Sequence, residues 1–473
     1  MSEVAPPSYV RDQIDIGIVH FGVGNFHRAH QALYLHELFE QGLAREWGIC
    51  GIGVLPGDAR MRDAMVAGGY QYTHVERLPD GNVRARRIGS VVAYLFAPDN
   101  PEAVLELLAQ PTTRIVSLTI TEGGYNTSSV TGRFDETAPA IAADLVARDA
   151  PATVFGIVVE ALARRRSSGI PPFTVMSCDN LQGNGEVARN AFVAFATLRD
   201  PELAAWIGER VSFPNSMVDR ITPATSEQDR QFVAAEFGAT DPWPVLSEDF
   251  RQWVLQDDFT LGRPPLEKVG VELVHDVAPY EKVKLRLLNA SHQALTYFGL
   301  LMGYEFVDQA ASDPLIARFL KRYMAEEAIP TLDPIPGFDA ERYGATVIER
   351  FSNIYVRDTL ARIATDAADR ISTFLLPVAL DGARAGRPTP FAAAVVASWA
   401  VFASSPLSAR IPERQRDLVD GARAAQKHDR AGFLREPRIF GDLASDPAFA
   451  ADFATLYRAI LDAGPAEALS SIL

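Results

Sequence analysis

The chain has 473 residues, enough for two or three domains of ordinary size. Hydrophobic residues make up 48% and charged residues 22%, a composition typical of a folded globular protein, so disorder is excluded as the main state. The formal net charge of −15 disfavours binding to nucleic acid or to an anionic membrane. With only two cysteines, Cys50 and Cys178, the chain has no disulfide scaffold and no cysteine-based metal site.

The N-terminal segment contains acidic residues and an early pair of prolines but no apolar core, so we do not expect it to be a signal peptide. The longest apolar-rich runs, 294–306 and 391–403, hold about 13 residues each, whereas spanning a bilayer takes about 20. We therefore expect a soluble, cytoplasmic protein with no membrane partner.

The basic residues are unevenly divided. Only five of the 45 are lysines, and the first 267 residues contain none. Codon usage is the simplest cause of such a bias. A buried lysine can nevertheless release its proton, which arginine cannot, so each lysine is a candidate for proton transfer.

The first half of the chain alternates short apolar runs with amphipathic stretches. Helical patterns occupy Ala29–Phe39 and Pro101–Leu108. Strand-length runs lie at Ile16–Phe21, Trp47–Val54, Ile115–Thr121 and Phe173–Ser177. This alternation predicts a parallel sheet covered by helices on both faces.

The second half is predominantly helical from about residue 280. Helical periodicity predicts helices at Glu281–Leu300, Asp313–Ala328, Arg342–Phe351, Ala392–Ala403, Arg414–Lys427 and Pro447–Ala463. We place a domain boundary near residues 275–281. The expected organisation is an α/β domain at 1–278 followed by a mainly α-helical domain at 279–473.

The segment HFGVGNFHRAH follows the first predicted strand. Gly22 and Gly24 permit a tight turn into a helix, the setting in which backbone N–H groups bind a dinucleotide pyrophosphate. The third glycine of the usual G-x-G-x-x-G pattern is replaced by His27. A tight turn without a ligand is the alternative.

An acidic residue after the second strand would complete a dinucleotide site by binding the ribose 2′-hydroxyl. Asp58 follows the 47–54 run, and its carboxylate would repel a 2′-phosphate, so NAD is favoured over NADP. Arg60 and Arg62 stand nearby and could hold a 2′-phosphate. A solvated loop acid is the alternative.

The helix YEKVKLRLLNASHQAL brings several polar groups together. At about 100° per residue, Lys284, His292 and Asn289 fall within an arc of about 140°. Alcohol oxidation by hydride loss needs a base for the hydroxyl proton and donors for the developing oxyanion. Lys284 is the candidate base, Asn289 and His292 are the candidate donors, and Glu281 could relay the proton to water. A solvated helix face is the alternative.

Polar residues also stand at the ends of other predicted strands, where ligands gather in open α/β folds. They are Asn180 in SCDNLQGNG, Asp219 and Arg220 in FPNSMVDRITP, and Glu122 in TITEGGYN. A turn at 179–180 and a buried Asp219–Arg220 ion pair are the structural alternatives. His20, His27, His30 and His36 cluster in sequence but lack a metal-binding motif, so we predict no metal site.

Several motifs together resemble the mannitol dehydrogenase family of polyol-specific long-chain dehydrogenases. They are HFGVGNFHRAHQA, TITEGGY, MSCDN, FPNSMVDRITP, LEKVG and K-x4-N-x2-H. The resemblance runs from about Ile16 to the last helices. It implies an N-terminal Rossmann-type domain, a helical C-terminal domain with the active site between them, no metal, and a monomer.

The resemblance also implies roles for individual residues. Lys284 matches the general base, Asn289 and His292 the groups that bind the reactive oxygen, and Asn180 an asparagine of the oxyanion site. Asp219 and Arg362 match substrate-binding residues, with Arg370 aligned to a second basic position. For the cofactor, the implied residues are Gly22, Gly24, Asn25, Phe26, Asp58 and Glu122.

The stretches ALTYFGLLMGYEF, ERFSNIYVRDTLARI and AAAVVASWA look most similar to family members that interconvert D-mannitol and D-fructose. Thr373 departs from this pattern, because relatives often carry lysine in that segment. D-arabinitol and sorbitol dehydrogenases and hexuronate reductases, acting on fructuronate or tagaturonate, share the same core motifs and are alternatives.

The function expected from the sequence is NAD-dependent oxidation of a polyol at C2. A dinucleotide-sensing protein without catalysis is the rival hypothesis. It would keep Gly22, Gly24 and Asp58 but would have no need of Lys284 with Asn289 and His292.

Overall fold

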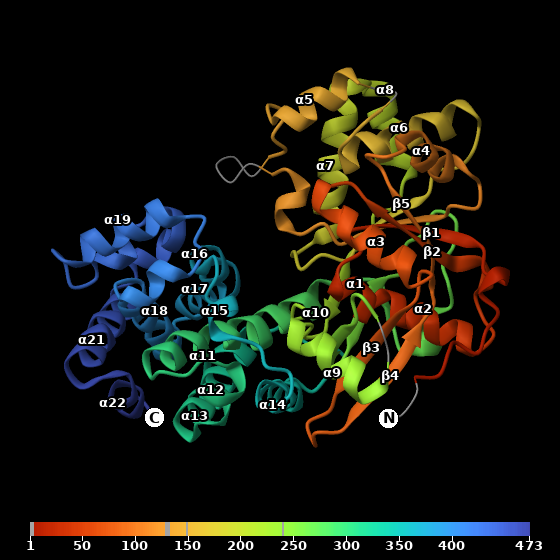
Figure 1. Cartoon of the computed structure of the whole chain (residues 1–473). Helices are drawn as coiled ribbons and strands as arrows, with labels where there is room; N and C mark the ends of the chain where they lie inside the picture. The colour runs from red at the N-terminus through yellow and green to blue at the C-terminus, as the bar shows by residue number, and fades with distance from the viewer. Residues whose placement is uncertain (1–3, 128–132, 148–149, 239–240) are drawn as a thin grey trace. The chain divides into compact units, whose positions relative to one another are not determined.

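The computed structural model describes residues 4–127, 133–147, 150–238 and 241–473. The chain divides into two compact units, Met1–Ala278 and Pro279–Leu473. The first unit is an α/β fold around a parallel sheet, and the second consists mainly of helices (Figure 1).

Five parallel strands form the central sheet of the first unit, in the order β5-β2-β1-β6-β7. Their bounds are β1 (Ile16–Phe21), β2 (Gly48–Gly53), β5 (Val91–Phe96), β6 (Ile115–Leu118) and β7 (Thr174–Ser177). The predicted parallel sheet is confirmed. The strand β1 lies in the middle, so the turn that follows it emerges at the centre of the carboxyl edge.

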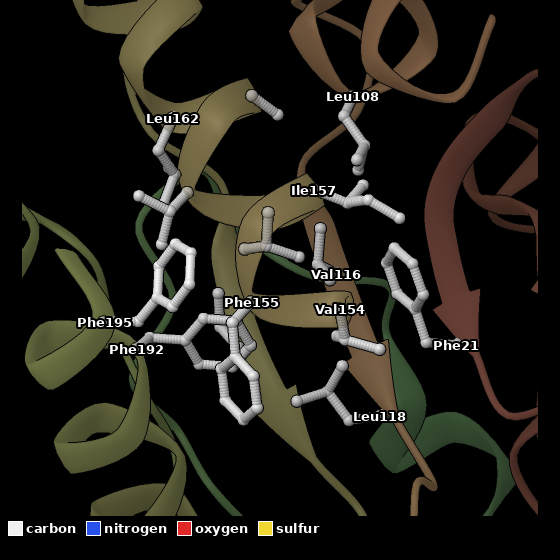
Figure 2. Packing of buried hydrophobic residues seen from close by; sticks show 14 of the residues in the cluster. Phe21, Leu108, Val116, Leu118, Val154, Phe155, Ile157, Leu162, Phe192 and Phe195 are labelled. Atoms are coloured by element: carbon white, nitrogen blue, oxygen red, sulfur yellow. The ribbon is translucent and has the colours of Figure 1, made fainter. Parts of the chain in front are cut away.

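Alternate residues of β1 pack on opposite faces of this sheet, as a strand requires. Val19 and Phe21 join one buried cluster, and Ile18 joins the other. Figure 2 shows Phe21 in the first cluster with Leu118, Phe155 and further apolar side chains. The helices of this face are α4 (Pro101–Ala109), α6 (Val154–Ser167) and α7 (Asn184–Arg199). On the opposite face, α2 (Gln31–Glu40) contributes residues to the second cluster.

The other strands described for the first unit form two three-stranded sheets. One has the order β11-β10-β8 and the other β4-β3-β9. Their bounds are β3 (Tyr72–Arg77), β4 (Val83–Ile88), β8 (Ser216–Asp219), β9 (Val245–Glu248), β10 (Gln252–Gln256) and β11 (Glu272–Val274). Further helices are α3 (Ala59–Ala67), α5 (Pro139–Val146), α8 (Pro201–Arg210) and α9 (Glu227–Phe237). These two sheets were not predicted from the sequence.

Several predicted elements have different bounds in the structure, and two of these differences lie close to the carboxyl edge of the central sheet. The helix predicted over Ala29–Phe39 is interrupted at His30, where φ is −124° and ψ −92°, so α1 (Asn25–Ala29) precedes α2. The strand predicted to end at Thr121 ends at Leu118, and Thr121 has a φ of +64°. Extended strand backbone requires a negative φ, so the strand cannot continue through Thr121.

The helix α18 (Pro390–Ala403) is buried on nearly every side and packs against α11 (Ala290–Leu301) and α21 (Pro447–Ala463) in the second unit. A helix that is apolar all round belongs in a core. The other helices before it are α10 (Ala278–Val283), α12 (Val307–Ser312), α13 (Pro314–Arg322), α14 (Ala340–Phe351), α15 (Leu360–Ile363), α16 (Ala367–Arg370) and α17 (Leu376–Arg384). Those after it are α19 (Arg416–Gln426), α20 (Pro437–Phe440) and α22 (Pro465–Ser470).

Three π-helical turns interrupt the helices of this unit. They are η6 (Lys284–Asn289), η7 (Tyr323–Ala328) and η9 (Ile371–Leu375), and η6 packs against both of the others. The prediction of one regular helix over residues 281–300 is therefore wrong in its geometry, although the segment is helical from end to end. A π-turn bonds residues five apart, so the angles of an α-helical wheel do not apply to Lys284 and Asn289.

Candidate active site

The turn after β1 has the backbone that its two glycines predict. Gly22 has a φ of +93°, and a Cβ atom there would lie 2.0 Å from the carbonyl oxygen of Thr119. Gly24 precedes α1, and the nearest atom to a Cβ on it would be 3.8 Å away, so space beside it is open. The turn therefore needs glycine at Gly22 for its own conformation and leaves the Gly24 backbone approachable.

The side chains after this turn are engaged within the protein. Asn25 donates through Nδ2 to the carbonyl of Pro223 and to Thr225, and its Oδ1 accepts from Arg28. The ring of Phe26 stacks on His30, with centroids 4.9 Å apart. Asn25 and Phe26 thus fix the position of α1, and their backbone is the part of them suited to a cofactor.

His27 replaces the third glycine by filling the space between strand and helix. Its ring stacks on His20 of β1, with centroids 3.5 Å apart and planes 9° apart. Burial lowers the pKa of His20 to about 3 and that of His27 well below its ordinary value, so both rings are neutral at pH 7 and can stack without repulsion. The departure from the glycine pattern is therefore accommodated by a ring pair in the core.

Asp58 ends the short turn Pro56–Asp58 that follows β2 and shapes the loop there. Its Oδ2 accepts hydrogen bonds from the backbone N–H groups of Val54 and Leu55, both at 2.9 Å. Arg62 forms ion pairs with Asp63 and Asp99 at 2.9 and 2.6 Å. The guanidinium of Arg60 lies over the ring of Trp243, 5.3 Å from its centroid. Arg62 is thus committed to other acids, whereas the ring contact of the exposed Arg60 leaves its N–H groups able to bind a ligand.

The carboxylate of Asp179, expected from the sequence only as part of a turn, connects two strand ends. It accepts from the backbone N–H groups of Ile120 and Thr121 at 3.1 and 2.8 Å, and from the hydroxyl of Tyr125 at 2.7 Å. Burial raises the pKa of Asp179 to about 6. Its signal in the sequence is an acidic residue directly after a buried strand, next to Asn180.

The remaining predicted residues of the first unit lie at or just beyond strand ends. Asn180 is exposed three residues after the end of β7, and Glu122 is exposed in the turn after β6. Asp219, the last residue of β8, is buried. Its neighbour Arg220 pairs with Glu76 at 2.8 Å. The chain does turn at 179–180, where the N–H of Leu181 donates to the carbonyl of Asp179, and the carboxylate of Asp179 adds the bonds to the other strand end.

In the second unit, Lys284 and Asn289 are the first and last residues of η6, and His292 follows in α11. Residues five apart in a π-turn are one turn apart, and residues three apart in an α-helix share a face. The three side chains therefore project along one side of this helix. Lys284 and His292 are each 8% exposed, so the alternative of a solvated helix face is wrong for both.

The surroundings of these residues suit an oxygen ligand. The His292 ring stacks on Phe351 at 4.0 Å, which fixes its orientation. Within the described part of the chain, the Oδ1 of Asn289 is buried and has no hydrogen-bond partner. A buried acceptor without a donor is costly, so this oxygen is suited to receive a hydroxyl group from a ligand.

Arg362 lies on α15 with its side chain half exposed. Its Nε donates to Asp358 Oδ1 at 2.6 Å and its Nη2 donates to Oδ2, so the buried Asp358 orients the guanidinium. Asp358 is a second residue that was not predicted from the sequence. Arg370 ends α16, and Thr373 is exposed in η9.

Each of the clustered histidines has a structural role. His20 bonds to Ser117 at 2.8 Å, His30 to the carbonyl of Gln252 at 2.9 Å, and His36 to the hydroxyl of Tyr9 at 2.8 Å. Over the residues that the structure describes, no group of three or more His, Cys, Asp or Glu side chains is arranged to hold a metal ion. None of the described helices is long and apolar enough to cross a membrane.

Comparison with known proteins connects both units to one family. The model of the mannitol dehydrogenase Rossmann domain matches residues 16–268, and that of the mannitol dehydrogenase C-terminal domain matches residues 276–461. The chain belongs to the mannitol dehydrogenase family. This membership confirms the resemblance inferred from the motifs. It also confirms that a Rossmann domain comes first in the chain and a helical domain second.

The family relatives cover nearly the whole chain. Mannitol 2-dehydrogenase of Cereibacter sphaeroides is 44% identical over 462 residues, 97% of this chain and 96% of that protein. Among solved structures, the Pseudomonas fluorescens mannitol 2-dehydrogenase in ternary complex with NAD and D-mannitol has a TM-score of 0.89 and 42% identity, covering 99% of this chain and 96% of that one. A D-sorbitol dehydrogenase in substrate-free form has a TM-score of 0.91 and 40% identity, covering 99% and 98%.

Proposed function

We propose that this chain is an NAD-dependent mannitol 2-dehydrogenase, which converts D-mannitol and NAD to D-fructose and NADH. Mannitol 2-dehydrogenases are among the relatives that cover nearly its full length, and one of them was solved with NAD and D-mannitol. The observation that carries the proposal is the helix from Lys284 to His292, where a buried amine and a buried imidazole share a face with an amide oxygen that has no partner within the described residues.

The chemistry assigned to these residues follows from their types. Lys284 accepts the proton of the C2 hydroxyl as general base. The N–H groups of Asn180, Asn289 and His292 donate to the C2 oxygen and stabilise its negative charge as the carbonyl forms. The open Oδ1 of Asn289 accepts a hydrogen bond from a hydroxyl group of the polyol. Asp219, Arg362 and Arg370 bind the remaining hydroxyl groups of the polyol. Of these, Arg362 is pre-oriented by its two bonds to Asp358.

The first unit has groups that fit NAD. Bound NAD supplies the hydride acceptor for this reaction. The open backbone at Gly24 and the turn at Gly22 suit the pyrophosphate, with the backbone of Asn25 and Phe26 beside it. Asp58 suits the ribose hydroxyls, and Glu122 lies in the turn after β6, on the other side of β1. Arg62 is engaged by Asp63 and Asp99, whereas the exposed Arg60 beside Trp243 is the cation that a 2′-phosphate would meet near Asp58.

The second candidate is a sorbitol dehydrogenase, favoured by the TM-score of 0.91 to such an enzyme. Thr373 at the position of a common lysine is a further reason to test the polyol directly. D-arabinitol and the hexuronates are further candidate substrates within the family. We also propose that the enzyme acts in the cytoplasm as a monomer, without a metal ion and without nucleic-acid partners.

The test is a substrate panel with purified protein. D-mannitol, D-sorbitol and D-arabinitol are oxidised with NAD and with NADP, and D-fructose and D-fructuronate are reduced with NADH. The expected result is the highest kcat/KM for D-mannitol with NAD, and loss of that activity in Lys284→Ala. Higher kcat/KM for sorbitol would favour the second candidate. NADH binding without turnover of any substrate would instead support the dinucleotide-sensor hypothesis.

A further inference from the structure

The π-turn at Lys284–Asn289 changes which side chains face one another. The N–H of Ala290 donates to the carbonyl of Leu285, five residues back, instead of the four of an α-helix. In a continuous α-helix, Asn289 would be about 140° round from Lys284. In the π-turn, the two residues lie one turn apart, on the same side. The alignment of the proposed base with the proposed oxygen ligand thus depends on one extra residue per turn.

Such a turn has an energetic cost that other groups must offset. Where π-helical bonding returns to α-helical bonding, one backbone carbonyl receives no hydrogen bond from a backbone N–H group. A buried carbonyl without a donor costs about 1–3 kcal/mol. Immediately after Leu285, the carbonyl oxygen of Arg286 receives a hydrogen bond from the hydroxyl of Tyr323, at 3.3 Å.

Tyr323 is suited to hold this carbonyl under the alkaline conditions that favour alcohol oxidation. Its side chain is fully buried, and it begins the adjacent π-turn η7. Burial raises the pKa of the Tyr323 hydroxyl well above its ordinary value, so the group remains a hydrogen-bond donor at high pH.

The side chain of Arg286 is also held in place, by an ion pair and a hydrogen bond. Nη2 forms an ion pair with Asp381 at 2.8 Å, and Nη1 donates to the carbonyl of Thr331 at 3.2 Å. Tyr323, Thr331 and Asp381 all lie outside the helix that carries Lys284. Arg286, in the middle of the π-turn, is therefore held at both its backbone carbonyl and its side chain by residues outside this helix.

We propose that Tyr323 is a positioning residue, whose hydroxyl holds the π-turn that aligns Lys284 with Asn289. The inference rests on the proposed function in taking Lys284 as the base. Removal of the hydroxyl favours regular α-helical bonding through residues 284–290, which rotates Asn289 away from Lys284. Misplacement of reacting groups by about 1 Å can cost about 100-fold in rate.

The variant Tyr323→Phe tests this in the full-length protein, because it removes one oxygen atom and keeps the ring. We expect kcat for polyol oxidation to fall about 10- to 100-fold, with less than about a threefold change in the KM for NAD. Amide hydrogen exchange, followed by mass spectrometry, should change in peptides that cover residues 284–291, because their N–H groups would bond to different carbonyl groups.

The matched control is Tyr297→Phe. Tyr297 is another fully buried tyrosine of the second unit, and its hydroxyl donates to Gln293 Oε1 at 2.7 Å within α11. This variant should lower the Tm to a similar extent as Tyr323→Phe and leave kcat close to that of the wild type. If Tyr323→Phe does not fold, Asp381→Asn releases the Arg286 side chain instead and should change kcat and exchange in the same direction.

The inference is overturned if Tyr323→Phe and Tyr297→Phe have equal kcat values, or if exchange over 284–291 is unchanged. Failure of the proposed function has a different signature, because the wild type would then oxidise no polyol or Lys284→Ala would keep its activity. The exchange measurement does not depend on turnover, so it decides whether Tyr323 holds the π-turn in either case.

Discussion

The carboxylate of Asp179 accepts a hydrogen bond from the backbone N–H of Thr121, at 2.8 Å. Thr121 has a φ of +64° and a ψ of 169°, a region of backbone space that is almost confined to glycine. Such a conformation costs about 1–3 kcal/mol and persists only when surrounding contacts impose it. Asp179 thus ties the strained turn after β6 to the end of β7, where Asn180 follows.

Asp179→Asn is expected to loosen this junction, because the amide nitrogen cannot accept the bonds that a carboxylate oxygen accepts. The free energy of unfolding should fall by about 1–3 kcal/mol, measured by urea denaturation at pH 7. Asp135→Asn is the control, since its side chain bonds the nearby Thr137 at the surface, and it should change stability by about 0.5 kcal/mol or less. Equal stability of the two variants would contradict the role assigned to Asp179.

Glu327 is expected to make stability depend on pH. Its carboxylate accepts from the N–H groups of Phe391 and Ala392 at the start of α18, and burial raises its pKa from an ordinary 4.5 to about 8. The folded chain therefore binds this proton more tightly than the unfolded chain does. The resulting stabilisation is complete below about pH 4.5 and is lost as the pH rises through about 8.

The measurement is Tm from pH 5 to pH 9 in the wild type and in Glu327→Gln, which cannot titrate. Each unit of pKa shift is worth about 1.4 kcal/mol, so the decline of Tm with pH should be clearly shallower in this variant. Glu326→Gln is the control, because Glu326 is exposed and pairs with Arg322. Parallel curves for wild type and Glu327→Gln would show that Glu327 does not titrate in this range.

The two glycines after β1 are expected to respond differently to alanine. Gly22→Ala places a Cβ against the Thr119 carbonyl at positive φ and should destabilise the protein by about 2–4 kcal/mol. Gly24→Ala meets no atom within 3.8 Å, so its Tm should stay near that of the wild type while the Kd of NADH rises about tenfold or more. Fluorescence titration with NADH and thermal unfolding separate these effects. Unchanged NADH affinity in Gly24→Ala would place the cofactor elsewhere.

Asp58→Asn removes the charge of this side chain and keeps its hydrogen bonds to the loop. The amide oxygen can still accept from the N–H groups of Val54 and Leu55, but the repulsion of a 2′-phosphate is gone. The ratio of kcat/KM with NADP to that with NAD should rise about tenfold, with little change in Tm. An unchanged ratio would mean that Asp58 acts only as a loop acid.

Lys284→Arg keeps the positive charge and removes the ability to accept a proton at working pH. We expect kcat to fall about 100- to 10,000-fold, the range that a general base contributes. Steady-state kinetics from pH 7 to pH 10 measure it. Lys282→Arg is the control, since Lys282 pairs with Asp333 and carries no proposed catalytic role. Comparable activity in both variants would remove Lys284 from the mechanism.

Local patterns in the chain predicted much of this architecture correctly. The run Ile16–Phe21 is β1 with the same bounds, and Pro447–Ala463 is α21 with the same bounds. Both have strong periodicity and clear boundary residues. The strands β3, β4 and β9 were not predicted, because segments such as VRARRI lack an apolar pattern and depend on pairing with distant strands.

The sequence by itself determined the family, the order of an α/β domain and a helical domain, and the residue types able to perform alcohol oxidation. It also made Lys284 conspicuous among 40 arginines. Tertiary structure alone decided that the helix around Lys284 is a π-turn, that Tyr323 donates to the Arg286 carbonyl, and that Asp179 holds Thr121. These features depend on contacts between residues that are 37 and 58 positions apart, which no local periodicity encodes.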